Sequence, residues 1–216
     1  MLLIWLACTG GDDATDDSVD PCANGGCTEP PSAPEVAISP LDPTTLDDLL
    51  CEVTVESEDP DGTAVSYTFS WTYNDQPTEI TGDTVSADQT QMSQEWECTV
   101  VATDEDGESA DPVTDAQVIE NSPPTAPEIA ITPETPTTDD LIECEVVVES
   151  TDPDDHPISY EYLWTDSAGN ELDNGLQDYR FIADNTEPGM VILCNVAAFD
   201  GRAYSDTVSA QVTIAD

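Results

Sequence analysis

The feature that most constrains this chain is an internal repeat with a spacing of 93 positions. Four pairs of segments match at this spacing: APEVAI at 33–38 with APEIAI at 126–131, CEV at 51–53 with CEV at 144–146, EDPD at 58–61 with TDPD at 151–154, and WT at 71–72 with WT at 164–165. A repeated segment of this length indicates a structural unit that occurs twice. Because 216 residues allow two domains of ordinary size, we predict domains at 32–121 and 125–216.

Each copy contains short segments in which apolar and polar residues alternate. Alternation with a period of two is the pattern of a strand with one buried and one solvated face. Proline, glycine and aspartate separate the segments, and no stretch has a helical period long enough to predict a helix. We therefore predict an all-β chain. The apolar positions are Leu49, Cys51, Val53, Val55, Tyr67, Phe69, Trp71, Trp96, Cys98, Val100 and Ala102 in the first copy, and Ile142, Cys144, Val146, Val148, Tyr160, Tyr162, Trp164, Ile192, Cys194, Val196 and Ala198 in the second.

In both copies a tryptophan follows the first cysteine by 20 positions and precedes a second cysteine. This Cys–Trp–Cys order across short alternating strands resembles the immunoglobulin-like sandwich, in which a disulfide joins two antiparallel sheets beside a buried tryptophan. The resemblance covers nearly everything after Ser32 and implies two tandem sandwiches. It implies the disulfides Cys51–Cys98 and Cys144–Cys194 and the core residues Trp71 and Trp164.

Two details of the copies bear on the exact family. The tyrosine that antibody-like domains place two residues before the second cysteine is Trp96 in one copy and Ile192 in the other. The turn DPDG at 59–62 leads into a Tyr-x-Phe-x-Trp strand, which also resembles the PKD and cadherin-like modules of bacterial surface proteins. The tyrosine-corner hydrogen bond is therefore not expected here.

The N-terminal segment 1–8 is apolar and ends at Cys8. Its last three residues, LAC, resemble the end of a bacterial lipoprotein signal, which implies a lipid anchor on Cys8 and a place at the outer membrane or cell surface. No basic segment precedes the apolar run, and a truncated secretory signal is the alternative. Seven apolar residues are too few to span a bilayer, which needs about 20.

The segment 9–31 is acidic and glycine-rich and lacks any period, so we expect a disordered stalk. Cys22 and Cys27 close a short loop in it, although a cross-link to another chain is the alternative. Of the seven cysteines, Cys8 is then the odd one out. Three disulfides imply an oxidising, extracytoplasmic compartment.

The charge of the chain excludes several partners. It has 48 aspartates and glutamates against two basic residues, for a formal net charge of −46. Such a chain cannot neutralise phosphates, so we expect no nucleic acid and no membrane contact beyond a lipid anchor. Adaptation to a saline habitat explains such an acidic surface. The alternative explanation is that some of the acidic side chains bind divalent cations.

Catalytic chemistry has little support. The single histidine, His156, lies in a turn beside a proline, where we expect it to be solvated. Nucleophilic triads and zinc sites need more histidines or free cysteines than this chain has. We predict that the chain is not an enzyme. A carbohydrate-active accessory or weakly hydrolytic unit using paired carboxylates is the alternative.

Calcium is the candidate ligand, because it takes six to eight oxygens from carboxylates, carbonyls and water. In immunoglobulin-like topology the B–C and F–G loops share one end of a sandwich. This acidic end of the second sandwich should also face the opposite end of the first sandwich, beside residues 120–121. Ordinary aspartate turn chemistry is the competing explanation. The candidate ligands are Asp59, Asp61, Asp104 and Asp106 in the first copy and Asp152, Asp154, Asp155 and Asp200 in the second.

The linker NSPP at 121–124 is short and proline-rich, so it favours an extended geometry and a rod of two domains. The predicted function is a non-catalytic binding or spacer module displayed at the cell surface, an adhesin-like lipoprotein stiffened by calcium. Its partner is expected to be a protein or glycan whose identity the sequence does not give.

Overall fold

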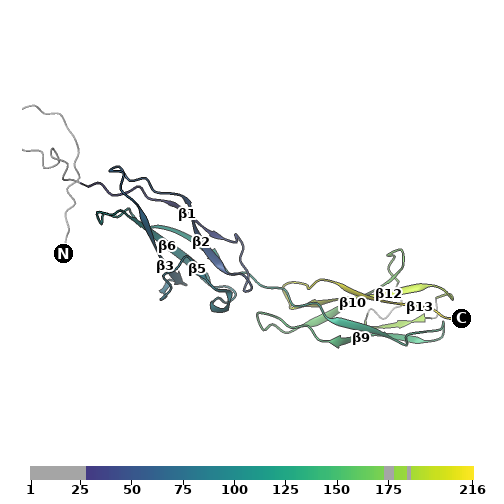
Figure 1. Cartoon of the computed structure of the whole chain (residues 1–216). Coiled ribbons are helices and arrows are strands. Elements are labelled where there is room, and N and C mark those ends of the chain that lie inside the picture. Colours follow the sequence, from purple (N-terminus) through teal and green to yellow (C-terminus); the bar gives the residue numbers. More distant parts are fainter. Residues whose placement is uncertain (1–27, 173–177, 184–185) are drawn as a thin grey trace, which may run out of the picture.

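A computed structural model describes residues 28–172, 178–183 and 186–216. These residues form two β-sandwiches that lie end to end (Figure 1). Strands make up 46% of the described residues and helix 2%, which confirms the all-β prediction. Cys8, Cys22 and Cys27, together with the predicted signal segment and most of the predicted stalk, lie outside the described residues.

The first sandwich consists of a three-stranded and a four-stranded antiparallel sheet, in the orders β1-β2-β5 and β4-β3-β6-β7. A constant-type immunoglobulin domain instead has its fourth strand on the sheet that corresponds to β1-β2-β5. Here the short β4 pairs with β3, so the fourth strand lies on the opposite sheet. The strands are β1 (Glu35–Ser39), β2 (Leu49–Val55), β3 (Ser66–Tyr73), β4 (Gln76–Pro77), β5 (Thr84–Val85), β6 (Glu95–Thr103) and β7 (Val113–Val118).

The second sandwich repeats this plan with two three-stranded sheets, in the orders β8-β9-β11 and β10-β12-β13. Among the described residues, an isolated bridge between Thr165 and Glu171 stands where the first domain has β4. The strands are β8 (Glu128–Thr132), β9 (Leu141–Val148), β10 (Ser159–Asp166), β11 (Arg180–Ile182), β12 (Val191–Phe199) and β13 (Val208–Thr213). Within the part of the chain that the structure describes, no helix is long and apolar enough to cross a membrane.

A disulfide joins the two sheets of each sandwich, as the resemblance implies. Cys51 of β2 bonds to Cys98 of β6 with a Cα–Cα distance of 6.4 Å. Every second residue of β6 is buried, and Trp71 packs in the same core. The indole Nε1 of Trp71 donates a hydrogen bond of 2.9 Å to the carbonyl of Gly82, so its one polar group is satisfied inside the core.

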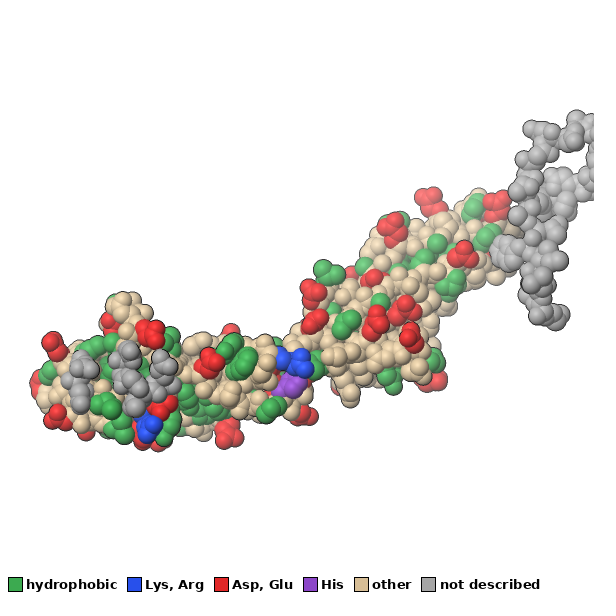
Figure 2. Space-filling model, turned by 180° about the vertical axis from the view of Figure 1, so that it is seen from behind, with side chains coloured by type: hydrophobic (Ala, Val, Ile, Leu, Met, Phe, Trp, Pro, Cys, Tyr) green, Lys and Arg blue, Asp and Glu red, His purple; other side chains and the backbone are tan. Residues whose placement is uncertain are grey.

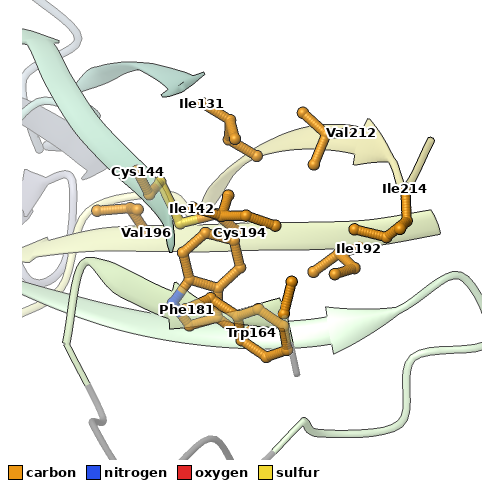
Figure 3. Packing of buried hydrophobic residues seen from close by; sticks show 11 residues of the cluster. Ile131, Ile142, Cys144, Trp164, Phe181, Ile192, Cys194, Val196, Val212 and Ile214 are labelled. Carbon is orange, nitrogen blue, oxygen red and sulfur yellow. A yellow bond between two sulfur atoms is a disulfide. The ribbon is translucent and has the colours of Figure 1, made fainter. Parts of the chain in front are cut away.

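The second core has the same construction (Figure 3). Cys144 of β9 bonds to Cys194 of β12, again with a Cα–Cα distance of 6.4 Å. Trp164 lies against Phe181, with ring centroids 5.3 Å apart, and donates from Nε1 to the carbonyl of Asp178 at 3.0 Å. The disulfides and core tryptophans predicted for both copies are thus confirmed.

A different tyrosine takes over the anchoring role of the missing corner residue. The hydroxyl of Tyr67, at the start of β3, accepts a hydrogen bond of 2.7 Å from the backbone N–H of Ser57. Tyr160 does the same at 2.8 Å for Ser150 in the second copy. Both contacts tie the strand to the loop before it, so they fix the acidic loops at the same end of each domain.

Candidate functional site at the domain junction

The predicted acidic loops lie at one end of each sandwich, and their first aspartates organise the turns. Asp59 Oδ1 accepts hydrogen bonds from the N–H groups of Asp61 and Thr63, at 2.7 and 3.1 Å. Asp152 Oδ1 does the same for Asp154 and His156, at 2.9 and 3.0 Å. This is the turn chemistry that aspartate side chains favour. Both turns also place a residue at positive φ, Gly62 in one copy and Asp155 in the other.

The aspartates of the second loop at each tip have the same role. Asp104 Oδ1 accepts from the N–H groups of Asp106 and Glu108, both at 2.9 Å. Asp200 Oδ1 accepts from Arg202 and Ala203, both at 2.6 Å. Ordinary turn chemistry therefore accounts for one oxygen of each organising aspartate.

Two of these carboxyl groups have pKa values below their ordinary range. Burial acts to raise the pKa of Asp59, but backbone N–H donors from the turn outweigh it and lower the pKa. At Asp200 burial again opposes the shift. Hydrogen bonds from the N–H of Ala203 and from the side chain of Asn121 outweigh it and lower the pKa of Asp200. Both groups are held as carboxylates, the form that accepts hydrogen bonds or binds a cation.

The tip of the second domain grips the linker and the bottom of the first domain. Asp154 Oδ2 accepts from the N–H of Ser122 at 2.8 Å, and Asp154 Oδ1 accepts from Thr45 Oγ1 at 2.8 Å. Asn121 Nδ2 donates to Asp200 Oδ2 at 2.8 Å. Ser122 is fully buried. The acidic tip of the second copy therefore faces the bottom of the first, as the strand directions predict.

The first domain repeats one of these contacts at its own tip. Asp61 Oδ2 accepts from the N–H of Glu29 at 2.8 Å. Asp61 and Glu29 stand 93 positions before Asp154 and Ser122, so both domains hold the chain that enters them in the same way. Asp154 additionally bonds to Thr45 of the other domain, a contact that only the junction provides.

Three side chains at the junction come close enough to share a metal ion. Asp152, Asp154 and His156 each offer one ligand atom, and these atoms lie within 4.8 Å of one another. Within the described residues this is the one group of three or more such side chains. Asp59, Asp61, Asp104 and Asp106 of the first tip do not form one, and neither Asp155 nor Asp200 belongs to it. On the face that Figure 2 shows, acidic side chains are spread over both domains.

The junction also contains buried polar atoms that make no hydrogen bond. The side chain of Asp152 is 1% exposed and that of His156 is 20% exposed. Asp152 Oδ2, His156 Nδ1 and Asn121 Oδ1 are each buried and make no hydrogen bond. Such atoms are rare in folded proteins, because burying an unsatisfied polar group is costly. Sequence reasoning assigned His156 to solvent and so missed it as part of this site.

Two grooves of the described surface differ in how far they resemble a glycosidase site. The junction groove, about 490 Å³ in volume, has no aromatic lining residue. A second groove, about 410 Å³, contains Tyr160, Tyr162, Glu161, Glu171 and Asp178. Glu161 there accepts a hydrogen bond from the hydroxyl of Tyr204 at 2.7 Å. The hydrogen bond from Arg180 lowers the pKa of Asp178, whereas a general acid for glycoside cleavage needs a raised pKa.

Comparison with known proteins identifies solved structures that are similar to this chain. No protein-family model matches the chain, and no curated protein matches it. A two-domain fibronectin type III segment from chicken tenascin matches at 16% identity, covering 86% of this chain and 99% of that one, with a TM-score of 0.37. The FN1–FN3 domains of chicken CNTN1 match at 13% identity, covering 87% and 68%, with a TM-score of 0.34. The class that strand order and disulfides define is a tandem immunoglobulin-like sandwich protein.

Proposed function

We propose that this protein is a non-catalytic binding or spacer module in which two sandwiches are held end to end. The observation that carries this proposal is the docked linker. Ser122 and Asn121 donate hydrogen bonds to two different loops of the second domain, through Asp154 and Asp200. Thr45 of the first domain also bonds to Asp154. Contacts of this kind fix the direction of one domain relative to the other, which is what a spacer requires.

Display at the cell surface is the second part of the proposal. It is supported by the lipoprotein-like LAC segment ending at Cys8 and by the disulfides, which form in oxidising compartments. An adhesin-like role, with a protein or glycan as partner, is consistent with exposed loops and edges on a rigid scaffold. The high negative charge favours partners that bring basic groups or that bind through cations.

Stiffening by a bound cation, for which the sequence suggested calcium, belongs to the proposal only at the junction. In the first domain the organising aspartates, Asp59 and Asp104, already accept hydrogen bonds from their own turns. No group of three ligand side chains gathers there among the described residues. The junction is the part of the molecule where a bound cation would also change how the two domains are held.

Surface display is tested with the full-length protein and its Cys8→Ser variant in intact cells. The wild-type protein should be cleaved by protease added outside the cells, and its mass should include a lipid on Cys8. The Cys8→Ser protein should lose both the lipid and the surface attachment. Wild-type protein that stays protected from external protease, or that carries no lipid, would refute this part of the proposal.

The binding role is tested by capture from cell-surface extracts. The wild-type chain should retain a specific protein or glycan. The second domain alone, fused to an unrelated spacer, should not retain it. Hydrolysis of a glycan by the wild-type chain, abolished by Glu171→Gln, would instead support the carbohydrate-active alternative.

A further inference from the structure

The two copies differ at the position that completes the first acidic turn. In the first domain, Thr63 closes the turn through its hydroxyl, which donates to Asp59 Oδ2 at 3.3 Å. The residue 93 positions later is His156. Its Nδ1 makes no hydrogen bond and lies 3.5 Å from Asp152 Oδ1. The replacement of threonine by histidine therefore leaves Asp152 Oδ2 without the donor that its counterpart has.

This unpartnered oxygen is deeply enclosed. The Asp152 side chain is 1% exposed, and Oδ2 has no hydrogen-bond partner. Water-accessible aspartates without partners are ordinary, but a buried carboxylate oxygen needs a donor or a cation. Two atoms with lone pairs, Asp152 Oδ2 and His156 Nδ1, are thus buried in the same turn, and neither makes a hydrogen bond.

We propose that Asp152, Asp154 and His156 bind a first-row transition-metal dication, with zinc as the reference ion. The inference deepens the proposed spacer function and rests on its end-to-end junction. Each of the three side chains offers a ligand atom within 4.8 Å of the other two. Ligands of a tetrahedral zinc ion at 2.0–2.2 Å stand about 3.3–3.6 Å apart. The 3.5 Å between His156 Nδ1 and Asp152 Oδ1 is such a separation. Oδ1 also accepts hydrogen bonds from the turn, whereas Oδ2 of the same carboxylate makes none.

The donor set distinguishes this ion from calcium. Calcium takes six to eight oxygen ligands, whereas imidazole nitrogen suits zinc, copper, nickel and iron. The gathered group holds three protein ligands, one of which is a nitrogen. Three protein ligands with a remaining position for water is an arrangement that zinc accepts. Asn121 Oδ1, which is also buried without a partner, is a further oxygen at the same junction.

A metal bound here would act on the joint between the domains. Asp154 is at once a candidate ligand and the acceptor for Ser122 of the linker and Thr45 of the first domain. A carboxylate has lone pairs for a metal in addition to these hydrogen bonds. The ion would hold Asp154 in the position that grips both partners, and the junction would become more rigid when it is bound.

The test must separate this site from the general attraction of a chain with a net charge of −46 for dications. The full-length protein, without an affinity tag and stripped with chelator, is titrated calorimetrically with Zn²⁺ and Ca²⁺ at matched ionic strength. The variants are His156→Thr, which copies the first domain, and Asp152→Asn. Asp59→Asn is the matched control, because it changes the corresponding aspartate at the other tip.

We expect one Zn²⁺ per chain in the wild-type and Asp59→Asn proteins, with affinity at least tenfold lower in His156→Thr and Asp152→Asn. The chain has one histidine, so a single imidazole signal in the NMR spectrum should shift with stoichiometric Zn²⁺ and reports even if a variant folds poorly. Equal Zn²⁺ binding by wild type and His156→Thr, tighter Ca²⁺ than Zn²⁺ binding, or an unmoved imidazole signal would each overturn the proposal. Because the metal-free junction already has its hydrogen bonds, loss of this site would leave the spacer proposal standing.

Discussion

The disulfide of the second domain allows a stability prediction whose size follows from the chain. Cys144 and Cys194 are separated by 50 positions. In the chain-entropy description, closing a loop of that length lowers the entropy of the unfolded state enough to stabilise the fold by about 4 kcal/mol. The double variant Cys144→Ala/Cys194→Ala should lose about that much, since both partners are removed and no free thiol remains.

Calorimetric melting of the full chain provides the assay, because each sandwich has its own core and its own disulfide. A loss of about 4 kcal/mol lowers the Tm of a domain of this size by roughly 15–30 °C. The transition of the second domain should move down by that amount while the transition of the first domain changes little. A decrease in Tm of less than about 5 °C, or an equal decrease for both transitions, would contradict the claim that each disulfide stabilises its own domain independently.

Two further predictions concern the carboxylates. Asp154→Ala removes two charge-assisted hydrogen bonds, one from the linker residue Ser122 and one from Thr45 of the first domain. In urea denaturation with chelator present, the free energy of the first unfolding transition should fall by about 2 kcal/mol. Asp61→Ala, which loses the single bond to Glu29, should cost less, and an equal cost would contradict the junction's role. Hydrogen bonds from the N–H and hydroxyl of Thr137 lower the pKa of Asp140. Its contribution is therefore complete above the ordinary value of 3.8 and is lost as the pH falls through the lower folded-state pKa. Asp140→Asn should flatten the Tm profile in that acidic window, and an unchanged profile would contradict the assignment.

The two-domain architecture was predictable because the repeat of 93 positions indicates two similar structural units. The two cysteines and the tryptophan of each copy resemble those of the immunoglobulin-like sandwich, and that resemblance implied the fold and the disulfides. Cys194 lies 96 positions after Cys98, three more than the spacing of the repeat, and β12 still pairs with β10 and β13. Assignment of the fourth strand to the sheet of β3 was not predictable, because β4 is two residues long and has no pattern of its own.

The site was predictable in part. The directions of the strands bring the second acidic tip to the linker, and Asp154 and Asp200 both contact it. The role of His156 could not be read from the sequence alone. The hydrogen bond from Thr63 to Asp59 in the other copy shows which donor Asp152 lacks when histidine takes the place of threonine. That hydrogen bond is seen only in the structure. Alignment of the two copies at this position is the signal that could have directed attention to it.

The end-to-end junction is tested most directly by the distance between spin labels placed on corresponding strands. Ser70 of β3 and Leu163 of β10 are exposed and stand 93 positions apart, so genetically encoded labels at both sites report the angle between the domains. We expect one narrow distance distribution for the otherwise unchanged chain and a broad one for Asp154→Ala/Asp200→Ala. A broad distribution in the unchanged chain would contradict a held junction and, with it, the proposed spacer.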